Sequence, residues 1–144
     1  MVRQVHKSVL VAHPPERMFG LVDDVASYPE FLPWCGGAAI VERGAESVEA
    51  EIRIDYRGIR QSFVTRNTLR PFERIDMNFV RGPFRSLAGN WFFIRVGDLG
   101  CRIEFKLQWE FASGVLSSLI APVFDSIADT MVDAFVRRAD EVYP

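Results

Sequence analysis

The chain has 144 residues, of which 49% are hydrophobic and 25% are charged. This length and composition predict one globular domain over residues 1–144. The formal net charge of −2 does not indicate a DNA-binding protein. Its two cysteines, Cys35 and Cys101, have no paired spacing, which argues against a disulfide framework or a zinc site. We expect a soluble cytoplasmic protein, because the N-terminus lacks an apolar signal segment and no apolar run approaches the length of a membrane span.

The N-terminal part of the chain predicts a strand followed by two short helical segments. Residues 2–12 have the pattern of a strand, which ends at His13 because the two prolines after it cannot donate to a sheet. Pro15 suits the first turn of a helix, and Glu16–Val25 carries apolar residues at helical spacing. Ser27–Cys35 predicts a short helical turn or a structured loop anchored by aromatic rings.

The middle of the chain predicts antiparallel strands joined by short turns. The last of them, Gly100–Phe111, alternates without a break between apolar and polar residues, which indicates one buried and one solvated face. The six predicted strands here are Ala38–Arg43, Ser47–Tyr56, Ile59–Leu69, Arg74–Val80, Ser86–Val96 and Cys101–Phe111.

A long amphipathic helix is predicted at the C-terminal end. Because proline starts or kinks a helix, we expect a break near Ala121 and a main helix over Pro122–Val142. The uncharged stretch Gly114–Phe124 has two interpretations: a helix start packed on the core, or an apolar lip that touches a bilayer.

These elements predict an α+β fold in which a curled antiparallel sheet holds the long helix on its concave side. The large apolar side chains between them either fill a dry core or line a pocket. A pocket is favoured because Gln61, Thr65 and Asn67 fall on the inward face of their strand, where a closed apolar core rarely admits unpartnered polar groups.

The outer face of the sheet is rich in arginine. Residues 53–85 hold eight arginines against Asp55, Glu73 and Asp76, a local balance of +5. This pattern is typical of a solvated face, and the alternative is a docking patch for the phosphates of lipid or RNA.

Motifs for catalysis are scarce, so we expect a non-enzymatic protein with neither catalytic residues nor a metal site nor a cofactor. The chain has no GxSxG, Gly-rich phosphate loop or HExxH, and His6 and His13 are too few for a metal cluster. A cyclase would need a buried acid, base or arginine, and Arg95 is the one candidate, on the inward parity of Trp91 and Phe93.

Four segments carry a resemblance to a known family. They are Tyr28–Cys35 (YPEFLPWC), Phe84–Phe93, Cys101–Phe111 and the region from Phe124 onward. Together they resemble the coenzyme Q-binding START-domain family, which also includes the bacterial ribosome-association toxins and belongs to the polyketide cyclase/lipid transport superfamily. The resemblance implies a helix-grip (START-like, SRPBCC) fold: a curved antiparallel sheet of six to seven strands around a long C-terminal helix, with two short helices after the first strand.

The resemblance further implies binding of ubiquinone (coenzyme Q) or a related polyprenyl lipid in a hydrophobic tunnel, in support of respiratory electron transport. Delivery of such a lipid would involve transient contact with the inner face of the membrane. The alternatives are a toxin-like inhibitor of ribosome association that binds the large subunit, and a polyketide cyclase/aromatase. The expected ligand-contacting residues are Trp34, Tyr56, Gln61, Phe63, Asn67, Met77, Phe79, Trp91, Phe93, Phe105, Leu107, Trp109, Phe124, Ile127, Met131 and Phe135.

Overall fold

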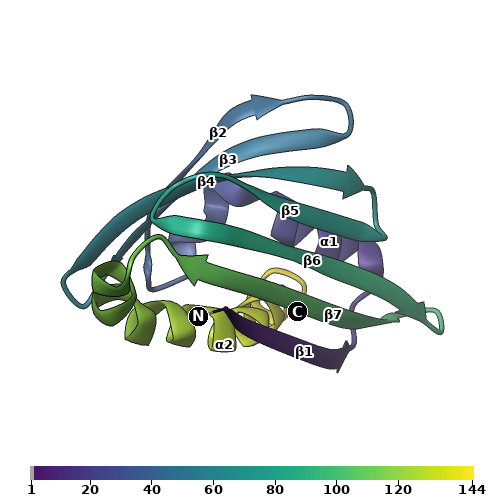
Figure 1. Ribbon diagram of the computed structural model, residues 1–144. Coiled ribbons are helices and arrows are strands. Elements are labelled where there is room, and N and C mark those ends of the chain that lie inside the picture. Colours follow the sequence, from purple (N-terminus) through teal and green to yellow (C-terminus); the bar gives the residue numbers. More distant parts are fainter. Residues whose placement is uncertain (1) are drawn as a thin grey trace.

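The computed structural model describes residues 2–144 as a curved sheet, one long helix on its concave side and two short helical segments (Figure 1). This is the predicted α+β helix-grip architecture. In chain order the elements are β1 (Arg3–Val11), α1 (Pro15–Asp23), the 3₁₀ segment η1 (Val25–Glu30), β2 (Cys35–Arg43), β3 (Ser47–Tyr56), β4 (Ile59–Arg70), β5 (Arg74–Arg81), β6 (Phe84–Val96), β7 (Gly100–Phe111) and α2 (Gly114–Val142).

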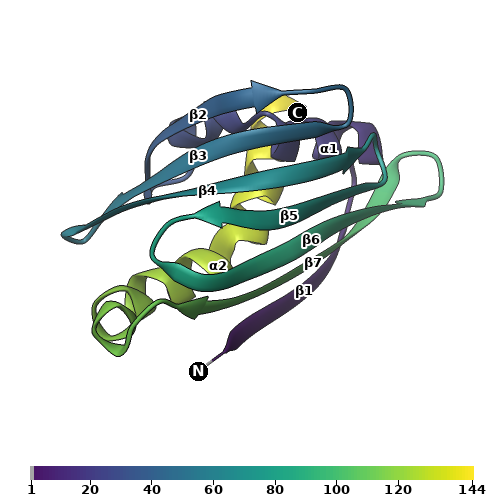
Figure 2. The same ribbon diagram turned by 45° about the horizontal axis from the view of Figure 1, so that its top comes forward.

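The sheet is antiparallel throughout, in the order β1-β7-β6-β5-β4-β3-β2, and Figure 2 shows it curving over α2. Consecutive strands from β2 to β7 are neighbours, whereas α1 and η1 connect the two edge strands, β1 and β2. The register shifts between Cys35 and Gly37, between Val64 and Thr65, and between Phe84 and Ser86. Such bulges increase the local twist and help a long sheet to curl.

The predicted face of each long strand is the one that is buried. On β7, Cys101, Ile103, Phe105, Leu107, Trp109 and Phe111 are all buried, as the unbroken alternation predicts. The rings pack edge to face between sheet and helix: the ring centroids of Trp91 and Phe135 lie 5.3 Å apart and those of Phe84 and Phe124 lie 5.1 Å apart.

Helix α2 is continuous, so the predicted break near Ala121 is wrong. Ser113 caps the first turn, with its Oγ accepting a hydrogen bond from the backbone N–H of Leu116 (3.1 Å). Pro122 lies inside the helix on its exposed side. Ser118, whose carbonyl loses its partner, is also an exposed residue, so water can reach this side of the helix and the proline is tolerated.

Three ion pairs and one histidine–carboxylate hydrogen bond fix α2 along one side and at its C-terminal end. Asp125 and Asp129 pair with Arg3 (2.7 Å) and Lys7 (2.9 Å) of β1. The other two are Arg138–Glu30 (3.1 Å) and His13–Asp140 (2.7 Å). By length and hydropathy α2 would also fit a membrane span, but here its apolar side packs on the sheet as the core helix.

Candidate ligand-binding cavity

A small apolar cavity lies between the concave face of the sheet and the middle of α2. Strands β3, β4, β5, β6 and β7 provide its roof, α2 its floor, and the segment from Val25 to Trp34 closes one end. Its volume is about 70 Å³. The lining residues are Val25, Tyr28, Trp34, Ala50, Ile52, Phe63, Thr65, Asn67, Met77, Leu87, Trp91, Phe105, Leu107, Phe124, Ile127 and Met131.

Many of the residues expected to contact ligand line this cavity. They are Trp34, Phe63, Asn67, Met77, Trp91, Phe105, Leu107, Phe124, Ile127 and Met131. The structure brings them together because strand alternation sets their direction and because α2 crosses the strands that carry them.

Six expected residues lie outside the cavity wall. Tyr56, Gln61 and Phe79 are half-buried on the inner face, towards the strand ends near the start of α2. Phe93 packs against Phe19 of α1 (5.7 Å) and Trp109 against Phe124 (5.0 Å), beyond the two ends of the cavity.

Phe135, the sixth, is fully buried and packs with Tyr28 (5.4 Å) and Phe31 (5.2 Å). Its place is in the core, so charging it would disturb folding before it affected a ligand.

The expected ligand-contacting set lacks six lining residues, of which Thr65 is predicted only to face inward: Val25, Tyr28, Ala50, Ile52, Thr65 and Leu87. Ala50, Ile52 and Thr65 lie on strand faces that the pattern already predicts as inward. Tyr28 and Val25 come from the segment after α1, whose path across the end of the sheet has no signature in periodicity.

The volume of the cavity limits what it holds in this conformation. An engineered apolar cavity of about 150 Å³ accepts benzene, and a water molecule takes a share of about 30 Å³ in the liquid. At 70 Å³ the cavity is smaller than a benzene site, so in this conformation it is much smaller than the expected ligand pocket. A quinone ring or a prenyl unit would require the wall to move.

The part of the cavity wall that can change shape most easily lies where α2 faces β4 and β5. Met131 on α2 and Met77 on β5 are half-buried there. Methionine repacks easily because its side chain is unbranched and flexible. Met77 also fills space left by a glycine: a Cβ on Gly89 would lie only 3.0 Å from the Met77 methyl and 2.5 Å from the Lys106 carbonyl oxygen. Across this gap α2 meets β4 through Phe124 and Phe63, whose ring centroids are 6.4 Å apart.

A few polar groups lie at or near the cavity. The Thr65 hydroxyl donates to Oδ1 of Asn67 (3.1 Å), which leaves the Asn67 amide nitrogen as a donor. The Tyr28 hydroxyl donates to the Val22 carbonyl, and burial, together with the nearby Asp23 carboxylate, raises the pKa of Tyr28. Beyond the cavity, the buried indole Nε1 of Trp109 has no hydrogen-bond partner.

The groups available for catalysis are poorly placed. Among described residues, the buried polar side chains are Thr65 and His13, and His13 is held at the far end of α2 by Asp140. Arg95 does not reach the core: it is exposed and pairs with Glu16 of α1.

The two cysteine thiols are also unsuited to act as nucleophiles. Burial raises the pKa of Cys35, whose Sγ lies 3.3 Å from the Gly37 carbonyl oxygen. Burial likewise raises the pKa of Cys101 to about 11. Both thiols are therefore protonated near neutral pH.

The first turns of α2 expose apolar side chains. Val115 is 71% exposed and Leu119 59% exposed, while Leu116 is half-buried. These turns lie beside the β5–β6 turn, where the Ala112 N–H donates to the Pro83 carbonyl (2.9 Å) (Figure 1). We call Val115, Leu116 and Leu119 the apolar lip.

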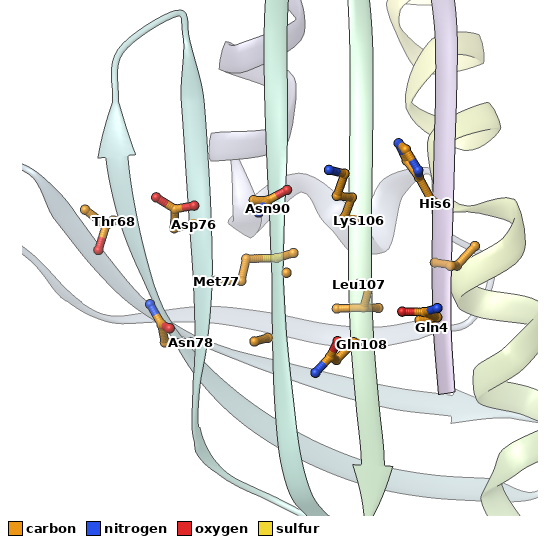
Figure 3. A pocket seen from close by; sticks show the side chains of 13 residues that line it. Gln4, His6, Thr68, Asp76, Met77, Asn78, Asn90, Lys106, Leu107 and Gln108 are labelled. Carbon is orange, nitrogen blue, oxygen red and sulfur yellow. The ribbon is translucent and has the colours of Figure 1, made fainter. Parts of the chain in front are cut away.

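A broad polar groove of about 950 Å³ occupies the opposite, convex face of the sheet. Figure 3 shows its side chains, which come from β1, β4, β5, β6 and β7 and include Asp76, Asn90 and Lys106. It is larger than the inner cavity but open and polar, so it does not suit an apolar ligand.

Comparisons with known proteins agree with this architecture. The sequence profile of the family described as "Polyketide cyclase / dehydrase and lipid transport" matches residues 11–136. The chain is 40% identical over 142 residues to the ribosome association toxin RatA of Vibrio cholerae, covering 99% of both chains. It is 27% identical to the mitochondrial coenzyme Q-binding protein COQ10 of Drosophila melanogaster, covering 92% of this chain and 56% of that protein.

A solved structure confirms the fold. The Zhui aromatase/cyclase of Streptomyces sp. R1128 superposes with a TM-score of 0.83, covering 97% of this chain and 94% of that chain. The two sequences are only 17% identical, so this similarity concerns the fold alone.

Proposed function

Because the chain belongs to the polyketide cyclase / dehydrase and lipid transport family, we propose that it binds a polyprenyl lipid, ubiquinone first among them, between the sheet and α2 and delivers it without catalysing a reaction. The observation that supports this best is the apolar cavity beneath α2, with two flexible methionines and an amide donor in its wall. A quinone offers only acceptors, and the Asn67 amide is a suitable donor for one of its carbonyls.

The cavity must widen to hold such a ligand. The contacts that hold α2 in place indicate which side of the helix can move. Ion pairs hold the helix to β1 and at its C-terminal end, whereas the β4 side has the Phe63–Phe124 contact and the half-buried Met131. We therefore place the opening between α2 and β4, where Tyr56 and Gln61 extend the inner face beyond the cavity.

Transfer would then be close to balanced in free energy. Burying a prenyl tail in the protein gains about 25 cal/mol per Å² of apolar surface, but a bilayer offers the same gain. A carrier of this kind can load and unload without an energy source. The apolar lip would bring the opening to the membrane, from a cytoplasmic protein that binds only transiently.

A transfer assay between vesicles tests this function. Donor vesicles carry ubiquinone, acceptor vesicles carry none, and transfer is followed by extraction and chromatography. Leu119→Glu should slow transfer and leave the amount of bound quinone unchanged, because a charge at the lip opposes membrane contact. Leu99→Glu is the matched control, since Leu99 is 75% exposed in the β6–β7 turn at the other end of the sheet. Equal slowing by both variants, or no transfer by the unaltered protein, would refute the proposal.

Ribosome association is the second candidate. It is favoured by full-length relatives that carry that name at 40% identity. Salt-sensitive co-sedimentation with the large ribosomal subunit would support it, and absence of co-sedimentation at low salt would exclude it. We do not propose cyclase chemistry, because Arg95 is exposed and the buried His13 is remote from the cavity.

A further inference from the structure

A second concavity, of about 610 Å³, lies where the β4–β5 turn meets α1 and the end of β6. Figure 2 shows this turn at the opposite end of the sheet from the start of α2. Its wall combines three arginines with aromatic rings: Arg70, Phe72, Arg74, Phe92 and Arg95 are the residues that matter here. We call it the arginine groove.

The arginine groove contains an arginine that forms no ion pair within the described residues. Arg70 on β4 stands directly opposite Arg74 on β5, and like charges in that position destabilise a sheet. Asp76 accepts a hydrogen bond from Arg74 (2.8 Å), and Glu16 pairs with Arg95. Arg70 forms no ion pair with any residue from 2 to 144, although Glu73 lies in the same wall. The position therefore favours an anionic ligand.

The turn also holds an aromatic ring in an unfavourable backbone conformation. Phe72 has φ of +68°, in the left-handed region that bulky side chains rarely adopt. Phe72 is 50% exposed, and its ring lies 5.7 Å from the ring of Phe19, measured between centroids. Nearby, the Arg74 guanidinium stacks 4.7 Å from the centre of the Phe92 ring. Two flat surfaces thus stand beside the unpaired Arg70.

The arginine groove continues into the polar groove of the convex face. Across the sheet, Phe92 and Arg74 form one row, and Asn90 and Asp76 form the next. Figure 3 shows Asn90 between Asp76 and Lys106 in that second row. Lys106 on β7 therefore adds a cation to this path, whereas the Oδ1 atom of Asn90 is buried and out of reach of a ligand.

We propose that the arginine groove and the adjoining polar groove bind single-stranded RNA. Phosphates contact Arg70 and Lys106, and a base stacks on Phe72 or on the Arg74–Phe92 pair. Exposed rings and guanidinium planes bind unstacked bases, which a duplex does not present. The biological role of this RNA site rests on the second candidate function, ribosome association, for which it would provide the binding surface. RNA binding here is independent of lipid binding, because the two grooves face away from α2.

Fluorescence anisotropy with a labelled short single-stranded oligoadenylate at low salt tests the proposal, with a duplex of the same length as competitor. Arg70→Glu should abolish binding and leave thermal stability equal or higher, because it replaces a like-charge pair by an opposite one. Phe72→Gly should weaken binding about tenfold, as the loss of one stacked base does, while it relieves the left-handed strain. Arg137→Glu on the exposed side of α2 makes the same charge change and should have little effect.

Several outcomes would overturn the assignment. They are unchanged affinity in Arg70→Glu, an equal loss in Arg137→Glu, and duplex binding as tight as single-strand binding. The failure of this proposal is separable from that of the lipid function. Arg70→Glu should retain its bound quinone, whereas Leu119→Glu should retain its affinity for RNA.

Discussion

Filling the cavity with Ala50→Leu should stabilise the fold and exclude the ligand at the same time. Ala50 is 1% exposed and lines the cavity from β3. At about 24 cal/mol per Å³, a void of 70 Å³ costs about 1.7 kcal/mol of stability. The three added carbons would gain at most about 2.4 kcal/mol on burial. A gain of about 1.7 kcal/mol corresponds to a rise in Tm of about 3–7 °C for a chain of this size.

The assay is thermal unfolding of delipidated protein by circular dichroism, together with the quinone content of protein purified in parallel. Delipidation matters because a bound ligand would itself raise the Tm of the unaltered protein. Ala128→Leu is the matched control: Ala128 is also 1% exposed but does not line the cavity, so overpacking should cost about 1–3 kcal/mol. A lowered Tm in Ala50→Leu, or an unchanged quinone content, would refute the reasoning.

Three further predictions concern the fold. Asp140→Ala should cost about 1–3 kcal/mol because it leaves the Nε2 atom of the buried His13 without its partner, whereas Asp129→Ala, which removes an exposed pair with Lys7, should cost less than about 1 kcal/mol; equal costs in urea unfolding would contradict this. The contribution of Cys101 to stability should be complete below about pH 9 and be lost towards pH 11, because the folded state raises the pKa of Cys101 to about 11 and the unfolded chain ionises first. Cys101→Ala should make the alkaline decline in stability shallower, and the raised pKa values of Cys35 and Tyr28 account for the decline that remains; a decline identical to that of the unaltered protein would exclude the Cys101 thiol as a contributor. Pro122→Ala should restore the hydrogen bond to the Ser118 carbonyl and stabilise the protein by up to about 3 kcal/mol, and an unchanged urea midpoint would contradict this.

The sequence predicted the strands and their inward faces well, because period-2 alternation determines the direction of each side chain. It predicted the inner wall of the cavity for the same reason, from Phe63 on β4 to Leu107 on β7. Pro122 led to a wrong prediction of where the C-terminal helix begins. The cost of a proline inside a helix depends on whether water can reach the freed carbonyl, and the periodicity of the sequence does not reveal this.

The part that could not be predicted is the outcome of packing. Whether large side chains leave a void depends on how rings from distant segments interlock, as Tyr28, Phe31 and Phe135 do at the end of the cavity. The arginine groove is a similar case. The local excess of arginine was visible in the sequence, but the cross-strand pairing of Arg70 with Arg74 depends on the register of β4 and β5.

The lipid content of the purified protein tests the central claim most directly. The protein is purified from cells that make ubiquinone, without detergent, and its organic extract is analysed by mass spectrometry beside that of Ala50→Leu. The account predicts a prenylquinone bound in a defined molar ratio to the unaltered protein and a marked loss in the variant. Absence of any prenylquinone from the unaltered protein, and its failure to take one up from vesicles, would contradict it.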